Sequence, residues 1–250
     1  MTTSISPVAA GPAQPPSFRG NSLAAGTLYL LTFASIPTLF LYGQVKEDPS
    51  FIAGAGPDHG IVLGGILEVL VALACIGTAV ALYPVVRRQN EALALGFVSM
   101  RILEAAAIFA GVVALMSIVT LREAGVGADG ILTGQALLAQ HTWTTLLGQG
   151  LIPAINALLL GPLMFRSRLL PRVLPVFGFI GAPFLIIGAV GVLLGLWGPA
   201  SPVSAIAALC LTVWEFGMGI YLVTKGFRRG GVARLAAASS QANLPVEVSR

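Results

Sequence analysis

Charged residues are scarce in this 250-residue sequence. Asp, Glu, Lys and Arg make up 10% of it, whereas a soluble globular domain carries about 25%. Two cysteines exclude a disulfide scaffold, and two histidines are too few for a usual zinc site. Hydrophobic residues, by contrast, account for 56% of the chain. The composition excludes an ordinary soluble enzyme and a disordered chain, and it predicts an all-α polytopic membrane protein.

Six hydrophobic runs are long enough to cross a ~30 Å hydrocarbon layer as helices. The predicted spans are 23–43, 61–83, 92–120, 141–165, 173–196 and 203–224. They define one six-helix transmembrane domain over 23–227. A Pro-, Ala- and Ser-rich segment at 1–22 and a polar segment at 228–250 are expected to be disordered N-terminal and C-terminal tails.

The distribution of cations predicts the orientation of these spans. One side of the membrane would carry eleven cations: Arg19, Arg87, Arg88, Arg166, Arg168, Arg172, Lys225, Arg228, Arg229, Arg234 and Arg250. The other side would carry only Lys46 and Arg122. Both termini are therefore expected to be cytoplasmic, and the net charge of +4 is explained by topology without a nucleic-acid partner. The basic turn at 166–172 leaves two roles open, a structural turn or a site for lipid headgroups or a docking partner.

A small set of polar residues lies inside the predicted spans, where a charged side chain costs at least about 2.5 kcal/mol. They are Glu68, Arg101, Glu104, Asn156 and Glu215. Arg101, Asn156 and Glu215 each lie ten residues from a cytoplasmic boundary, so we expect them to share one layer about 15 Å deep. Glu104 follows one turn after Arg101, and Glu68 is expected nearer the outer surface. These five residues form the predicted site for a ligand or an ion.

Two further patterns bear on this site. His141, Thr145 and Gln149 fall on the same face of the fourth span as Asn156, which predicts a polar funnel from the outer surface. Ile-Pro dipeptides at 36–37 and 152–153 open the first and fourth spans, so the chain could consist of two three-span halves of opposite topology.

Other chemistry has little support in the sequence. His59, His141 and Asp58 could ligate a metal or haem, but hydrated histidines at the outer boundary are the expected alternative. Cys75 and Cys210 are expected at different depths, as unpaired buried thiols. Nucleophile, zinc and phosphate-loop motifs are lacking, so we predict no catalytic residue, no metal site and no cofactor.

The segments ALYPVVRRQNE at 81–91 and RILEA at 101–105 resemble the bacterial integral-membrane family catalogued as domain of unknown function 4386. So do LIP at 151–153, NALLLG at 156–161, FRSR at 165–168, PRVLP at 171–175, GAP at 181–183 and WEF at 214–216. The resemblance excludes the tails and the loop at 124–138. It implies a six-span protein of a bacterial inner or plasma membrane, and it carries no catalytic residue over. In the turn at 87–91, Asn90 is expected to cap the third span.

Two functions remain open from the sequence. In the first, the protein binds or transports a proton, a cation or a small polar ligand at the predicted intramembrane site. In the second, it is a membrane scaffold or sensor subunit whose polar cluster only fixes helix packing. An intramembrane enzyme ranks below both. The partners that fit are membrane lipids, a small ligand or cation, and further copies of the chain in a homo-oligomer.

Overall fold

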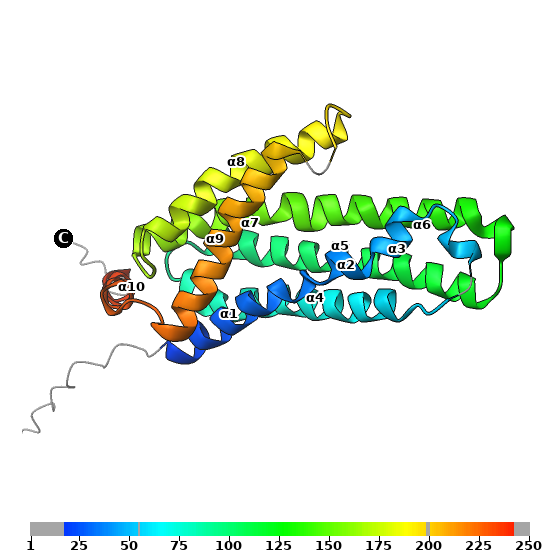
Figure 1. Cartoon of the computed structure of the whole chain (residues 1–250). Coiled ribbons are helices and arrows are strands. Elements are labelled where there is room, and N and C mark those ends of the chain that lie inside the picture. Colours follow the sequence, from blue (N-terminus) through cyan, green and yellow to red (C-terminus); the bar gives the residue numbers. More distant parts are fainter. Residues whose placement is uncertain (1–17, 55, 199–200, 243–250) are drawn as a thin grey trace, which may run out of the picture.

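A computed structural model of the protein describes residues 18–54, 56–198 and 201–242, and these residues form helices without strands (Figure 1). The first half of the chain contains α1 (Arg19–Leu31), η1 (Thr32–Ser35), α2 (Thr38–Leu41), α3 (Gly43–Glu47), η2 (Phe51–Ala53), α4 (His59–Val86) and α5 (Glu91–Glu123). The second half contains η3 (Gly127–Gly130), α6 (Ile131–Thr145), the π-helix η4 (Leu146–Leu151), α7 (Ile152–Ser167), α8 (Val173–Leu193), α9 (Pro202–Thr224) and α10 (Arg229–Ala242).

Among the described residues, six helical rods are long and apolar enough to cross a membrane, which confirms the all-α, six-span prediction. They are Arg19–Leu41, His59–Val86, Glu91–Glu123, Gly127–Ser167, Val173–Leu193 and Pro202–Thr224. Large apolar side chains such as Leu39 and Phe40 are exposed on their outer faces, as expected of surfaces that contact lipid. The chain is therefore a multi-pass membrane protein.

The rods pack as a closed ring in chain order. α1 packs on α4, α4 on α5, α5 on α6 and α7, α7 on α8, α8 on α9, and α9 back on α1. Glycine allows the closing contact, because a Cβ atom on Gly26 of α1 would lie 2.8 Å from the carbonyl oxygen of Gly219 on α9. Residues that point inward from the first, second, third, fourth and sixth rods thus meet in the interior of the bundle.

Several boundaries differ from the sequence predictions. The first rod begins at Arg19, so residues 19–22 of the expected N-terminal tail are helical, while 1–17 lie outside the described residues. The loop expected at 124–138 forms η3 and the start of α6. The fourth rod consequently has 41 residues and is about 60 Å long, twice the hydrocarbon thickness.

The expectation of disorder from residue 228 onward was wrong for α10. Its low mean hydropathy hid a one-sided apolar face, on which Leu235 is buried in the main core and Val232 packs against it. Gly231 allows the helix to approach the α7–α8 turn, because a Cβ there would lie 2.9 Å from the carbonyl oxygen of Arg168. The expected tail therefore closes one end of the bundle, and 243–250 lie outside the described residues.

Two prolines interrupt the opening rods of the two halves. Pro37 cannot donate a backbone hydrogen bond, and the preceding turn is the 3-10 segment η1. Pro153 follows η4, in which the N–H of Ile152 bonds to the carbonyl of Leu147, five residues earlier. The first and fourth rods are thus both irregular near their Ile-Pro pairs.

Candidate functional site

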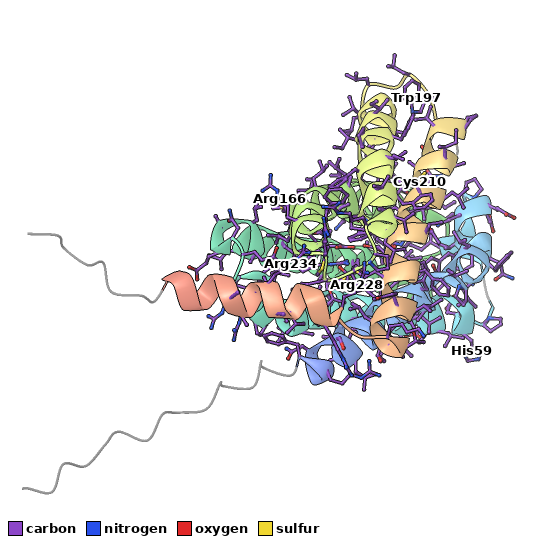
Figure 2. All side chains as sticks on the ribbon, turned by 90° about the vertical axis from the view of Figure 1, so that its left-hand side faces the viewer. His59, Arg166, Trp197, Cys210, Arg228 and Arg234 are labelled. Carbon is purple, nitrogen blue, oxygen red and sulfur yellow. The ribbon has the colours of Figure 1, made fainter. Side chains whose placement is uncertain are left out.

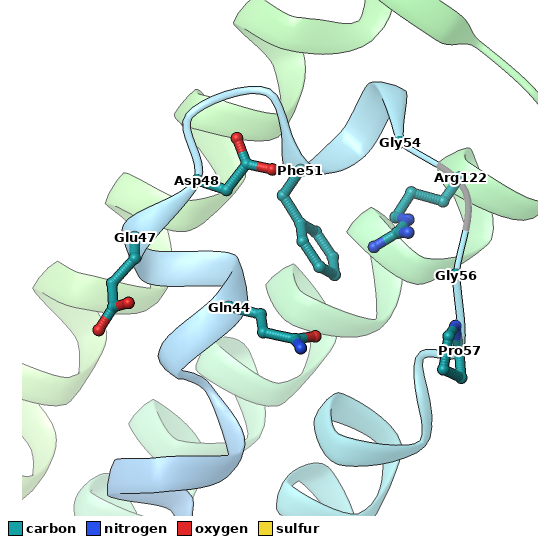
Figure 3. A pocket seen from close by; sticks show the side chains of 8 residues that line it. All are labelled: Gln44, Glu47, Asp48, Phe51, Gly54, Gly56, Pro57 and Arg122. Carbon is teal, nitrogen blue, oxygen red and sulfur yellow. The ribbon is translucent and has the colours of Figure 1, made fainter.

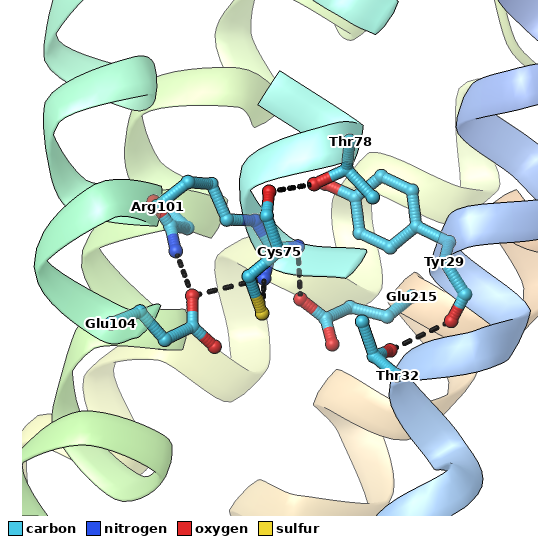
Figure 4. A network of polar contacts seen from close by, with 8 residues as sticks. Tyr29, Thr32, Cys75, Thr78, Arg101, Glu104 and Glu215 are labelled. Atoms are coloured by element: carbon cyan, nitrogen blue, oxygen red, sulfur yellow. Dashed lines mark hydrogen bonds and ion pairs between the residues drawn. The ribbon is translucent and has the colours of Figure 1, made fainter. Parts of the chain in front are cut away.

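Arg101 of α5 is buried in the interior of the bundle, with only 1% of its side chain exposed. Its Nη1 donates to Oε2 of Glu104, one turn along the same helix, at 2.9 Å. Its Nη2 donates to Oε1 of Glu215 on α9 at 3.2 Å (Figure 4). One guanidinium therefore joins carboxylates from the third and sixth rods. Arginine suits this position better than lysine, because its planar guanidinium presents several donors in a fixed geometry.

Three other rods complete this group. Asn156 of α7 donates through Nδ2 to Oε2 of Glu104 at 2.8 Å. Cys75 of α4 has its Sγ 3.6 Å from Nη1 of Arg101. Tyr29 of α1 places the centroid of its ring 4.8 Å from the guanidinium carbon of Arg101, which makes a cation–π contact. We call Tyr29, Cys75, Arg101, Glu104, Asn156 and Glu215 the central cluster.

The rise along each helix explains why these residues lie at the same depth in the bundle. Arg101 lies ten residues after the start of α5, Asn156 eleven before the end of α7, and Glu215 nine before the end of α9. At 1.5 Å per residue each is about 15 Å from the same end of the bundle. Asn90, whose Oδ1 accepts the N–H of Leu93 at 2.9 Å, caps α5 as predicted and fixes where that count begins.

A cavity of about 150 Å³ adjoins the central cluster. Arg101, Glu104 and Glu215 line one part of it, and the Glu215 side chain is 16% exposed. The interrupted segments also line it, through Thr32 and Ser35 of η1 and through Gln149 and Pro153 at the junction of η4 and α7. This volume is large enough for a few water molecules or one small ligand.

Gln149 also lines a second, more apolar cavity of about 430 Å³ between η4, α8 and α9. Ser201 and Ser204, near the start of α9, border that cavity. The two cavities therefore adjoin at one polar side chain, and Figure 1 shows α8 and α9 inclined to α7 on this side of the molecule.

The fifth predicted site residue lies elsewhere. Glu68 of α4, 4% exposed, has its Oε1 3.8 Å from Nε2 of His141 on α6. The ring of Tyr42 stands edge-on to the His141 ring at 5.4 Å, and Gly64 leaves space for it. We call Tyr42, Glu68 and His141 the outer cluster. The sequence placed Glu68 correctly toward the opposite end from the basic turns, but it did not identify its partner.

The three residues of the predicted funnel, His141, Thr145 and Gln149, do not line one common cavity. His141 is only 2% exposed, so the expectation of a hydrated residue at the outer boundary was wrong. Thr145 is half-buried and does not line the cavity at the central cluster. Only Gln149 reaches it, because the π-turn shifts the face that α6 and α7 would otherwise share.

Gln44, Glu47, Asp48 and Arg122 line a separate hollow of about 500 Å³ near that end (Figure 3). Arg122 pairs with Asp58 at 3.1 Å and covers the ring of Phe51 at 3.7 Å. Hydrogen bonds from Ser50 hold the pKa of the Asp48 carboxyl below its usual value. His59 is exposed at the start of α4. Within 18–54, 56–198 and 201–242, no group of three or more His, Cys, Asp or Glu could hold a metal ion, and Cys75 and Cys210 are unpaired.

Comparison with known proteins places the chain in a family without an assigned activity. The family described as a domain of unknown function (DUF4386) matches residues 24–226, so the chain belongs to it. The match includes the segment at 124–138, where the sequence alone showed no resemblance. No curated protein and no solved structure matches the chain.

Proposed function

We propose that the central cluster and its cavity bind a proton, a small cation or a small polar ligand within the membrane, and that the protein transports it. One observation supports this above the others: Arg101, Glu104 and Glu215 line a cavity instead of being sealed in a dry network. Charged side chains in the middle of a bundle are costly and commonly mark ion or proton pathways.

The charges favour a positively charged ligand. Two carboxylates face one guanidinium, so the ionised cluster would carry a net charge of minus one. An uncompensated carboxylate in such surroundings is strongly disfavoured, and a bound cation or proton would neutralise it. Glu215 is the more exposed of the two acids and would contact the ligand first.

The irregular helices provide a means of access. Discontinuous helices beside a site near the bilayer midplane are typical of transporters built from two inverted halves. Here η1 and η4 belong to the opening rods of the two halves, and both line the cavity. A route through the adjoining cavity would pass Gln149, which we assign as the gate residue. From the cation distribution we place the termini and the turns at 87–91 and 166–172 in the cytoplasm. The family resemblance supports a bacterial plasma membrane as the location.

The test uses purified protein in liposomes that contain a pH-sensitive dye. Gradients of Na⁺, K⁺ or methylammonium are applied, and the internal pH is followed. We expect a cation-dependent pH change with the parent protein, its loss in Glu104→Gln and Glu215→Gln, and its retention in Glu123→Gln. The last variant changes an exposed acid at the end of α5, the helix that carries Glu104.

The scaffold or sensor function makes the opposite prediction. If the parent protein shows no flux and no stabilisation by these cations, and both glutamine variants unfold in detergent, the cluster only fixes helix packing. Folded variants with unchanged flux would equally contradict the proposed site.

A further inference from the structure

A cavity of about 620 Å³ lies at the end of the bundle where α1 begins and α9 ends, below α10. Its cationic lining residues are Arg19, Lys225 and Arg229, and no acidic residue lines it. A fourth cation is adjacent, since the Arg88 guanidinium lies 5.0 Å from the ring of Phe18, which also lines the cavity. Like charges gathered around one cavity repel each other, and an anion bound between them would offset this repulsion.

The cavity is fixed by the fold of the chain. Arg19 donates through Nη2 to the carbonyl oxygen of Val223 at 3.0 Å and thereby caps the end of α9. The turn after α9 has a positive φ of 71° at Gly226, and a Cβ there would lie 2.9 Å from Nη1 of Arg19. Arg228 donates its backbone N–H to Leu169, which attaches the start of α10 to the α7–α8 turn. Figure 2 shows α10 lying across this end, with Arg228 and Arg234 nearby.

The apolar residues of the lining restrict the classes of ligand that fit this cavity. Phe18, Phe227 and Val232 border the same cavity as the three cations. The cavity also lies where the first and last membrane spans end, which is the depth of lipid phosphates. A ligand that matches both features carries a phosphate group beside an apolar portion.

We propose that this cavity binds the phosphate headgroup of an anionic phospholipid, with α10 as its cover. Basic pockets between spanning helices are suited to such headgroups, and each cation near an anionic surface strengthens binding about fivefold. The site is independent of the central cluster and does not require transport.

The experiment measures the unfolding temperature of the full chain in detergent during titration with dioleoylphosphatidylglycerol, dioleoylphosphatidylcholine or inorganic phosphate. The variant Arg19→Gln/Lys225→Gln/Arg229→Gln removes the three lining cations. The matched control, Arg87→Gln/Arg166→Gln/Arg234→Gln, removes three exposed cations that do not line the cavity. Arg19 caps α9, so its replacement could unfold the triple variant. The double variant Lys225→Gln/Arg229→Gln keeps Arg19 and is therefore measured as well.

We expect phosphatidylglycerol, and not phosphatidylcholine, to stabilise the parent and the control. The triple variant should bind about 100-fold more weakly, and the double variant about 25-fold. An equal loss in the control would overturn the site in favour of diffuse surface attraction. Equal stabilisation by inorganic phosphate alone would overturn the lipid and indicate a soluble phosphate ligand.

Discussion

The guanidinium of Arg101 lies 3.2 Å from the carboxylate of Glu215, although 114 residues separate them in the chain. This contact joins the last rod of the first half to the last rod of the second half. Because Arg101 also holds Glu104, its loss would leave two acids in the bundle interior without a positive partner.

Arg101→Met should therefore destabilise the protein severely, by about 3 to 5 kcal/mol, as expected when one partner of a buried ion pair is removed. Arg101→Met/Glu104→Gln/Glu215→Gln should recover part of this loss, because it removes the orphaned charges. Thermal unfolding in detergent measures both, with the exposed Arg166→Met as the control. If the free energy of unfolding of Arg101→Met lay within about 1 kcal/mol of that of the parent, the role of the ion pairs would be contradicted.

Asn156 should contribute through its hydrogen bond to the Glu104 carboxylate. Asn156→Ala is expected to cost about 1.5 to 3 kcal/mol, the range for a hydrogen bond to a charged group. In a double-mutant cycle with Glu104→Gln, the two changes should be non-additive by at least about 0.5 kcal/mol. Strict additivity would mean that the 2.8 Å contact contributes nothing to stability.

The two clusters should respond independently. Glu68 pairs with His141, and Glu215 pairs with Arg101. The unfolding free energies of Glu68→Gln and Glu215→Gln should then add to within about 0.5 kcal/mol in the double variant. Strong coupling between them would instead support the single five-residue site expected from the sequence.

Gly64→Ala tests how Tyr42 is held in the outer cluster. A Cβ at this position would contact the Tyr42 ring directly, so the ring must move and about 1 to 3 kcal/mol of stability should be lost. Gly43→Ala, at which the new Cβ would meet no other segment of the chain within 4 Å, is the control. Because the clash is then already absent, Tyr42→Ala should cost less stability in the Gly64→Ala background than in the parent, and strictly additive costs would contradict this origin of the defect.

The sequence predicted the six spans and four members of the central cluster because both depend on local quantities. Hydropathy over about 20 residues defines a span, and counting from a span end gives the depth of Arg101, Asn156 and Glu215. Tyr29 was missed, since an aromatic residue in an apolar run has no distinctive signal until the guanidinium lies against it. The pairing of Glu68 with His141 was missed for another reason. The polar residues of α6 obscured its helical character, so the sequence placed His141 at the start of a span and not ten residues inside α6.

The π-turn at 146–151 has a consequence for helix phase. One extra residue in a turn rotates everything beyond it by about 100° relative to a regular α-helix. His141 lies before this turn and Asn156 after it, and each contacts a different acid. Deleting one residue from η4 would restore a regular helix, but the rod could then keep His141 beside Glu68 or Asn156 beside Glu104, and not both. The register of this helix on either side of the π-turn is therefore fixed to a single residue. We expect the segment to tolerate neither an insertion nor a deletion.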